Sequence, residues 1–93
     1  HRSRARMKII PSRRFEKHVS KLSSHLRIVL AERLRLFATE QQHPLLNNHA
    51  LRGAWRHLRS INISCDYRLI YEKVGDDIVR LFDIDTHHNL HGS

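Results

Sequence analysis

The feature that most constrains the fold is a pair of apolar alternating runs in the second half of the chain, which meet at Asp66. Apolar side chains occupy every second position on both sides of Asp66: Ile61, Ile63 and Cys65 before it, and Tyr67, Leu69 and Tyr71 after it. A period of two is typical of a strand with one buried face. We therefore expect two antiparallel strands joined by a tight reversal, with Cys65 as a small core residue.

The residues before this pair predict an edge strand and two helices. Met7–Pro11 is a short apolar run stopped by proline, which suits an edge strand. Ser12 and the pair Ser23–Ser24 are candidate N-caps, and apolar residues at helical spacing follow each of them. The first helix has Phe15, Val19 and Leu22, and the second has Leu26, Leu30, Leu34 and Phe37 and is expected to end before residues 41–44. Both stripes are expected to face the core.

Residues 43–50 are predicted to form a connecting loop, with Asn47 and Asn48 as turn formers. A hairpin turn is expected at residues 75–77, and Ile78 to Ile84 should form a further strand. Its apolar residues do not alternate cleanly, as in a strand buried on both sides. The order is β-α-α-β-β-β, an α+β domain with a helical hairpin packed on a small antiparallel sheet.

Length and charge predict one basic domain. The chain has 93 residues, and 17 Lys+Arg against nine Asp+Glu give a net charge of +8. Residues 1–6 resemble a vector remnant or a disordered arm, and residues 7–93 are expected to be a single domain. Such a charge indicates a polyanionic partner, such as nucleic acid or an acidic protein, although a merely solvated basic surface is the alternative.

Cysteine content and hydropathy favour a cytoplasmic protein. The single cysteine, Cys65, excludes an internal disulfide and any cysteine-based zinc site within one chain. It fits a reducing compartment, and its strand position favours a packing role over a nucleophile. The sequence has no apolar run long enough to span a bilayer and no apolar core of a signal peptide. We expect no membrane association.

Polar residues from distant parts of the chain could converge at one end of the sheet. The candidates are His49 in the loop, Asp66 and Tyr67 at the reversal, and His87, His88 and His91 after the last strand. Four arginines are near enough in sequence to line a shared cleft: Arg52, Arg56, Arg59 and Arg68. Imidazole, carboxylate and guanidinium groups suit cleavage of RNA, in which the ribose 2′-OH attacks the adjacent phosphorus. Histidine titrates near neutral pH and can serve as acid or base.

Other readings of these residues stay open. His87 and His91 have the i, i+4 spacing of a helical metal site, but no HExxH pattern or clear carboxylate partner accompanies them, so we expect no metal or other cofactor. Trp55 is either a packing residue at the core or its rim, or, like Tyr67, a platform on which an unpaired base stacks. The arginines, taken singly, could belong to a solvated face.

The combination of motifs is more specific than its parts. H-x-L-x-G-x-W at residues 49–55, L-R-S at residues 58–60, D-Y-R-L-I-Y at residues 66–71 and D-x-x-T-H-x-x-L at residues 83–90 together resemble the RelE/ParE toxin superfamily. Within it, the chain is similar to the YafQ branch of bacterial type II toxin–antitoxin modules. The resemblance covers the chain from Met7 to Gly92.

This resemblance implies a small basic ribonuclease that enters the ribosomal A site, cuts mRNA during translation and is restrained by an antitoxin in a hetero-oligomer. It implies catalytic roles for His49, Asp66 and His87, and an aromatic role for Tyr67. Arg59 and Arg68 match basic positions that would hold the phosphate backbone.

Three departures from the family pattern bear on the division of roles. Asn62 stands where some relatives have a further histidine, and an amide cannot exchange a proton near neutral pH. His91 stands where an aromatic residue is usual, and we hypothesise that it supplies a second imidazole. Cys65 replaces a common glycine, which predicts a different shape for the reversal.

Two rival functions remain at this stage. A ParE-like member of the superfamily would inhibit DNA gyrase without cleaving RNA, but such members generally lack the histidines. A non-catalytic basic nucleic-acid-binding module would explain the charge but not the convergence of His49, Asp66 and His87.

Overall fold

The computed structural model of the chain describes residues 7–86. Its elements in chain order are β1 (Lys8–Pro11), α1 (Arg13–Val19), α2 (Ser24–Thr39), the 3-10 helix η2 (Pro44–Leu46), β2 (His49–Ala50), the 3-10 helix η3 (Gly53–Trp55), β3 (Leu58–Asn62), β4 (Tyr67–Gly75) and β5 (Ile78–Thr86). The predicted order of long elements is confirmed. The structure adds the two 3-10 turns and the two-residue strand β2.

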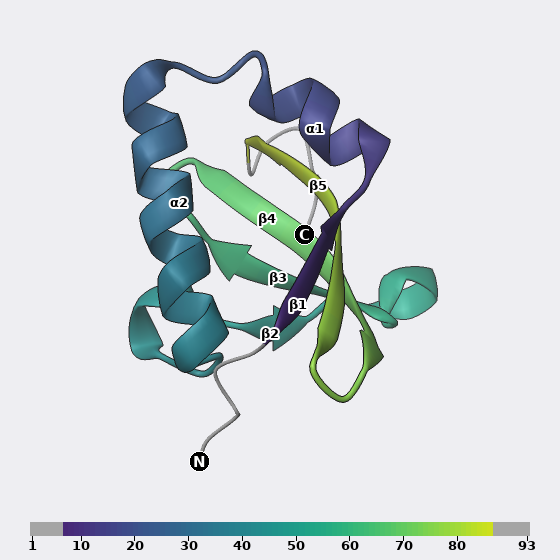
Figure 1. Ribbon diagram of the computed structural model, residues 1–93. Helices are drawn as coiled ribbons and strands as arrows, with labels where there is room; N and C mark the ends of the chain where they lie inside the picture. The colour runs from purple at the N-terminus through teal and green to yellow at the C-terminus, as the bar shows by residue number, and fades with distance from the viewer. Residues whose placement is uncertain (1–6, 87–93) are drawn as a thin grey trace.

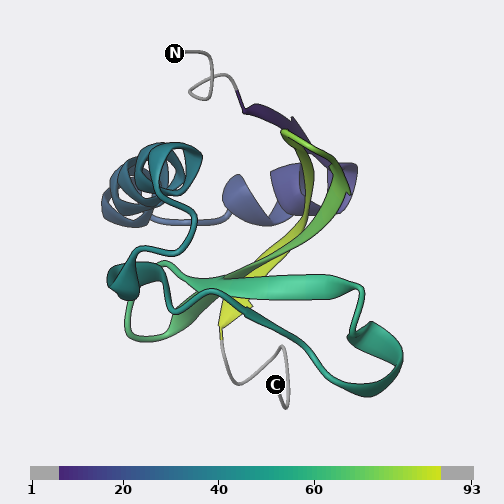
Figure 2. The same ribbon diagram turned by 90° about the horizontal axis from the view of Figure 1, so that it is seen from below.

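The strands form one five-stranded sheet in the order β1-β5-β4-β3-β2. The pairs β2–β3, β3–β4 and β4–β5 are antiparallel, whereas β1 lies parallel to β5. The expected antiparallel sheet is therefore mostly antiparallel, with one parallel edge. The two helices connect β1 to the rest of the sheet and lie over the same face of it (Figures 1 and 2). We refer to this as the helix face and to the opposite side as the second face.

Serine side chains start both helices where the sequence indicated. The Ser12 hydroxyl accepts a hydrogen bond from the Phe15 backbone N–H at 3.0 Å, and the Ser23 hydroxyl accepts one from the Leu26 N–H at 3.1 Å. Each hydroxyl satisfies a backbone donor that the first turn of a helix leaves unpaired. The Ser12 hydroxyl also donates to the Phe82 carbonyl at 2.9 Å, which ties the start of α1 to β5.

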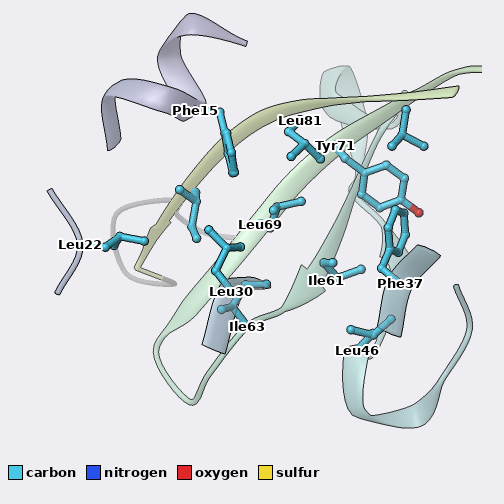
Figure 3. Packing of buried hydrophobic residues seen from close by; sticks show 12 residues of the cluster. Phe15, Leu22, Leu30, Phe37, Leu46, Ile61, Ile63, Leu69, Tyr71 and Leu81 are labelled. Carbon is cyan, nitrogen blue, oxygen red and sulfur yellow. The ribbon is translucent and has the colours of Figure 1, made fainter. Parts of the chain in front are cut away.

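The core fills the space between the helices and the sheet (Figure 3). Phe37 from α2 is fully buried and meets the ring of Tyr71 edge-on, with centroids 4.8 Å apart and an interplanar angle of 65°. Edge-to-face geometry is favourable for aromatic pairs. Leu30 is buried as predicted, while Leu34 is only partly buried.

The uneven apolar pattern of the last strand has a local cause. Ile70 pairs with Asp83 but its neighbour Tyr71 pairs with Leu81, so Phe82 is an extra residue in β5. Such a bulge shifts the alternation of faces along the strand. The sequence alone attributed this pattern to burial on both sides, whereas the register accounts for it directly.

One packing prediction is wrong. Cys65 is exposed, because β3 ends at Asn62 and the residues that follow belong to the reversal rather than to a strand. Trp55 lies in η3 with 56% of its surface exposed, which excludes a place in the core and leaves a rim position or a base platform. Among the described residues, no helix is long and apolar enough to cross a membrane.

Candidate active site

His49 is held in a defined tautomer by the residue two positions before it. Its Nδ1 lies 2.8 Å from the carbonyl oxygen of Asn47. A carbonyl can only accept a hydrogen bond, so Nδ1 carries the proton and the neutral ring keeps an unprotonated Nε2. Asn47 adopts the left-handed conformation with φ 46° at the end of η2, a conformation that asparagine tolerates better than most residues. The ring is thus prepared to accept a proton at Nε2.

The strand register places His49 on the second face. His49 pairs with Ser60, which pairs with Ile70, and directly paired residues of antiparallel strands share a face. The next row toward the reversal on this face joins Asn62 to Arg68. The Asn62 carboxamide oxygen accepts a hydrogen bond from Arg68 Nη1 at 2.9 Å. A histidine and a guanidinium group therefore belong to adjacent rows of one face.

Two buried polar atoms on this face stand out. Within the described part of the chain, Ser60 Oγ and Arg68 Nε have no hydrogen-bond partner. Buried donors without a partner are rare and call for an explanation. Both atoms are shielded from solvent, so a phosphate could approach Arg68 only through the outer part of its guanidinium group.

Asp66 is exposed at the reversal between β3 and β4. The reversal is closed by the Ile63 N–H, which donates to the Tyr67 carbonyl at 2.9 Å, and by the Tyr67 N–H, which donates to the Ser64 hydroxyl at 3.3 Å. Among the described non-glycine residues only Asn47 has a positive φ, so Cys65 adopts this reversal without the backbone strain that would require glycine. Tyr67 pairs with Thr86, which is the last described residue of β5. Asp66 directly precedes Tyr67, so it lies near this end of β5.

His49 and Asp66 are not in contact. His49 lies in the same row as Ile70, two strand spacings across the sheet, and Asp66 precedes Ile70 by four residues, in the reversal just before β4. This gives a backbone separation of roughly 15 Å. The predicted catalytic residues His87 and His91 lie outside the described residues. Within residues 7–86, no group of three or more His, Cys, Asp and Glu side chains is arranged to bind a metal ion.

The four arginines divide between different surfaces. Arg59 pairs with Tyr71 and so points to the helix face, whereas Arg68 points to the second face. Arg52 and Arg56 flank η3 and are exposed. Gly53 opens η3 with φ +64°, which explains the glycine of the H-x-L-x-G-x-W motif, because a side chain is strained in that conformation.

Tyr67 packs against the core as a partly buried residue, two positions from Leu69 and on the same face. Its ring therefore supports the reversal from the helix side.

Sequence reasoning also missed two polar residues: Asn48, which joins three segments beside His49, and Asp83, which is buried and bonded to α1. The motif at residues 83–90 contained the only signal for Asp83, and it did not indicate a role.

This fold is the fold of RelE-type toxins. The chain is similar to the structure of the DinJ–YafQ toxin–antitoxin complex of E. coli, with a TM-score of 0.74 and 23% identity over 92% of this chain and 98% of that one. It is also similar to the toxin–antitoxin complex RelBE2 of Mycobacterium tuberculosis, with a TM-score of 0.66 and 20% identity over 87% and 98% of the two chains.

A copper-bound mutant toxin from Helicobacter pylori has a TM-score of 0.68 and 28% identity over 91% of this chain and 99% of that one. No curated protein sequence matches the chain. The family model described as "Bacterial toxin of type II toxin-antitoxin system, YafQ" matches residues 7–92. The chain belongs to this family, and it is the toxin component of a type II toxin–antitoxin module.

Proposed function

We propose that this toxin is a ribosome-associated endoribonuclease that inhibits translation by cutting mRNA. The observation that carries the proposal is the fixed tautomer of His49, whose Nδ1 donates to Asn47 and whose Nε2 keeps its lone pair. Arg68 lies on the same sheet face, and its side chain is partly exposed. A base and an anion-binding donor on one face suit a reaction at a phosphodiester.

In the proposed reaction, His49 Nε2 takes the proton of the ribose 2′-OH as that oxygen attacks the adjacent phosphorus. The bond from phosphorus to the 5′-oxygen breaks, and a protonated histidine, His87 or His91, gives its proton to that oxygen. The products are a 2′,3′-cyclic phosphate and a 5′-hydroxyl. Asp66 acts at the end of the sheet where β5 ends, roughly 15 Å from His49, by orienting one of these histidines.

The separation of His49 from Asp66 restricts their roles. A carboxylate at that distance cannot share a proton with His49 directly, so Asp66 takes part in the reaction only through the histidine that it orients. Arg68 is proposed to contact the scissile phosphate, and Arg52 and Arg56 the flanking backbone. Arg59 and Tyr67 point to the helix face, and we propose that they hold the site in shape at its margin.

The proposed chemistry needs no metal or organic cofactor, since the histidines transfer both protons and arginine offsets the charge on the pentacoordinate phosphorus. Each positioned acid or base contributes on the order of 10²–10⁴ in rate. Cleavage should therefore continue in EDTA, provided that the ribosomes themselves remain intact.

An antitoxin is the proposed partner. Two of the similar solved structures are toxin–antitoxin complexes, one from E. coli and one from Mycobacterium tuberculosis. We propose that a cognate antitoxin with an acidic or amphipathic segment binds this chain in a hetero-oligomer and offsets its net charge of +8. The cytoplasm, where ribosomes translate mRNA, is the proposed place of action.

The decisive experiment is to induce the toxin and map the 5′ ends of cellular mRNA against the reading frame. New ends in register with codons, lost in His49→Gln and in His87→Ala, are the expected result. Growth arrest with intact mRNA and impaired supercoiling by DNA gyrase would instead favour a ParE-like function. Growth arrest of undiminished strength in both histidine variants would reject this site.

A further inference from the structure

The side chain beside His49 uses its whole carboxamide group to join three elements. The amide nitrogen of Asn48 donates to the Gln41 carbonyl at 3.0 Å and lies 2.9 Å from the Tyr71 hydroxyl. Its oxygen accepts from Arg59 Nε at 2.9 Å and lies 3.1 Å from the same hydroxyl. Asn48 thus joins the segment after α2 to β3 and to β4.

These partners are firmly placed. Tyr71 is 1% exposed and packs edge-on against Phe37, which is fully buried. Arg59 belongs to a paired strand, opposite Ala50 and Tyr71. An amide held by such partners from the interior cannot rotate without breaking several hydrogen bonds at once.

The backbone that carries His49 lies at the edge of the sheet. The strand β2 comprises only His49 and Ala50, and it is held by two residue pairs with β3 and by the Leu51 N–H, which donates to the Leu58 carbonyl at 3.0 Å. Neighbouring side chains of an extended segment point to opposite sides. Asn48 reaches the helix face, as its partners show, and His49 shares the second face with Ser60. The interior anchor and the functional ring are therefore adjacent residues on opposite sides of one short segment.

The contact between His49 and Asn47 depends on this anchor. The Asn47 carbonyl meets the ring only while Asn47 keeps its left-handed conformation and the peptide to Asn48 keeps its direction. Left-handed backbone is unfavourable for a residue with a side chain, so neighbouring contacts must maintain it. Asn48 is the next residue, and its carboxamide fixes the segment on the far side.

We propose that Asn48, held by Tyr71 and Arg59, is a positioning residue that keeps His49 as the Nδ1–H tautomer with Nε2 ready to accept a proton. Only the expected change in cleavage rate rests on the proposed ribonuclease function. The tautomer itself is a property of the free protein and can be measured without substrate.

The first test is long-range ¹H–¹⁵N NMR of the imidazole nitrogens at pH 8, where histidine is mostly neutral. The signal lost in His49→Gln identifies His49. In the wild-type protein we expect a protonated Nδ1 and an unprotonated Nε2. In Asn48→Ala the pattern should move toward the Nε2–H form that free histidine prefers, and Tyr71→Phe, which removes one oxygen atom, should move it in the same direction.

Val79→Ala is the matched control. Val79 is 2% exposed in β5, two strands away from β3. It should lower Tm without changing the His49 signals, which separates positioning from general destabilisation. If Asn48→Ala does not fold, Tyr71→Phe decides the question.

The second test is cleavage of mRNA on ribosomes by the same variants. Misplacement of a reacting group by about 1 Å can cost about 10²-fold, so kcat should fall by up to that factor in Asn48→Ala with KM little changed. A wild-type His49 in the Nε2–H form, or a wild-type tautomer pattern kept in folded Asn48→Ala and Tyr71→Phe, would overturn the inference. A wild-type toxin that cleaves no RNA would reject the proposed function, while the NMR result would still decide the role of Asn48.

Discussion

His18 Nδ1 lies 2.5 Å from Oδ1 of Asp83, and this contact fastens α1 to β5 beyond the point where β1 ends. Arg14 Nε donates to the other carboxylate oxygen at 2.9 Å. The Asp83 side chain is 2% exposed, whereas the side chains of Arg14 and His18 are 62% and 28% exposed. One buried carboxylate thus joins a seven-residue helix to β5, the second strand of the sheet.

Replacing Asp83 should destabilise the fold. Asp83→Ala removes hydrogen bonds to two side chains and one to the Ile84 N–H, and we expect a loss of about 2–3 kcal/mol in the free energy of unfolding. The loss should stay below that of breaking a fully buried ion pair, because Arg14 and His18 can regain water. Urea denaturation measures it. Glu72→Gln, at an exposed contact with Arg80, is the control and should cost about 0–1 kcal/mol.

The helix α2 should show a steep contrast between its buried and exposed sides. Phe37→Ala should lower the free energy of unfolding by about 3–5 kcal/mol, because it leaves a cavity against Tyr71. Leu34→Ala, at a partly buried position, should cost about 2 kcal/mol. Ile28→Ala should cost no more than about 0.5 kcal/mol, since Ile28 is 59% exposed. Equal losses at all three positions would contradict the assigned core.

The loop that carries Trp55 requires glycine at position 53 because of the backbone conformation there and not because of crowding. An added Cβ would meet no atom within 4 Å, so the cost of Gly53→Ala arises from φ +64° alone, about 1–2 kcal/mol. Gly53→Asn should cost less, because asparagine tolerates this conformation. Thermal denaturation of the two variants should rank them in that order. A steric origin would give the reverse order, since asparagine is larger.

Local signals made much of this fold predictable. The caps Ser12 and Ser23 and the stripe of α2 depend on residues within a few positions of one another. The parallel pairing of β1 with β5 joins residues about 70 positions apart, and no local pattern encodes it. The apolar alternation remains correct as far as buried Ile63, and its next step made exposed Cys65 resemble a core residue, because no local pattern shows where the strand gives way to the reversal.

The candidate site was less accessible to sequence reasoning. The motifs singled out His49 and Asp66, but not the roughly 15 Å between them, because that distance follows from the sheet register. Arg59 and Arg68 looked equivalent in sequence, and strand pairing directs them to opposite faces. The sequence pattern presents Asn48 only as a turn former, because its partners come from three segments that are distant in sequence: the turn after α2, β3 and β4.

His49→Gln should lower the rate of mRNA cleavage by about 10²–10⁴-fold while leaving Tm nearly unchanged. The ring is partly exposed and its one hydrogen bond among the described residues is to Asn47, so the fold loses little. His57→Gln is the matched control, because His57 is an exposed histidine outside the proposed site. A single-turnover assay on ribosomes measures the rate. Equal activity of the two variants would remove His49 from the mechanism.

The exposed arginines around η3 should contribute to RNA affinity through charge. Arg52 and Arg56 are both exposed, so each would contact phosphate without desolvating a buried group. Removing one phosphate contact lowers the slope of log K against log salt by about 0.7 for a single strand. Arg52→Ala and Arg56→Ala should each show this change with an uncleavable 2′-O-methyl RNA, measured by fluorescence anisotropy. Arg35→Ala, an exposed arginine of α2 over the helix face, should keep the wild-type slope. An equal fall of the slope in all three variants would mean that RNA affinity depends on the total charge of the protein. The arginines around η3 would then not form a specific RNA contact.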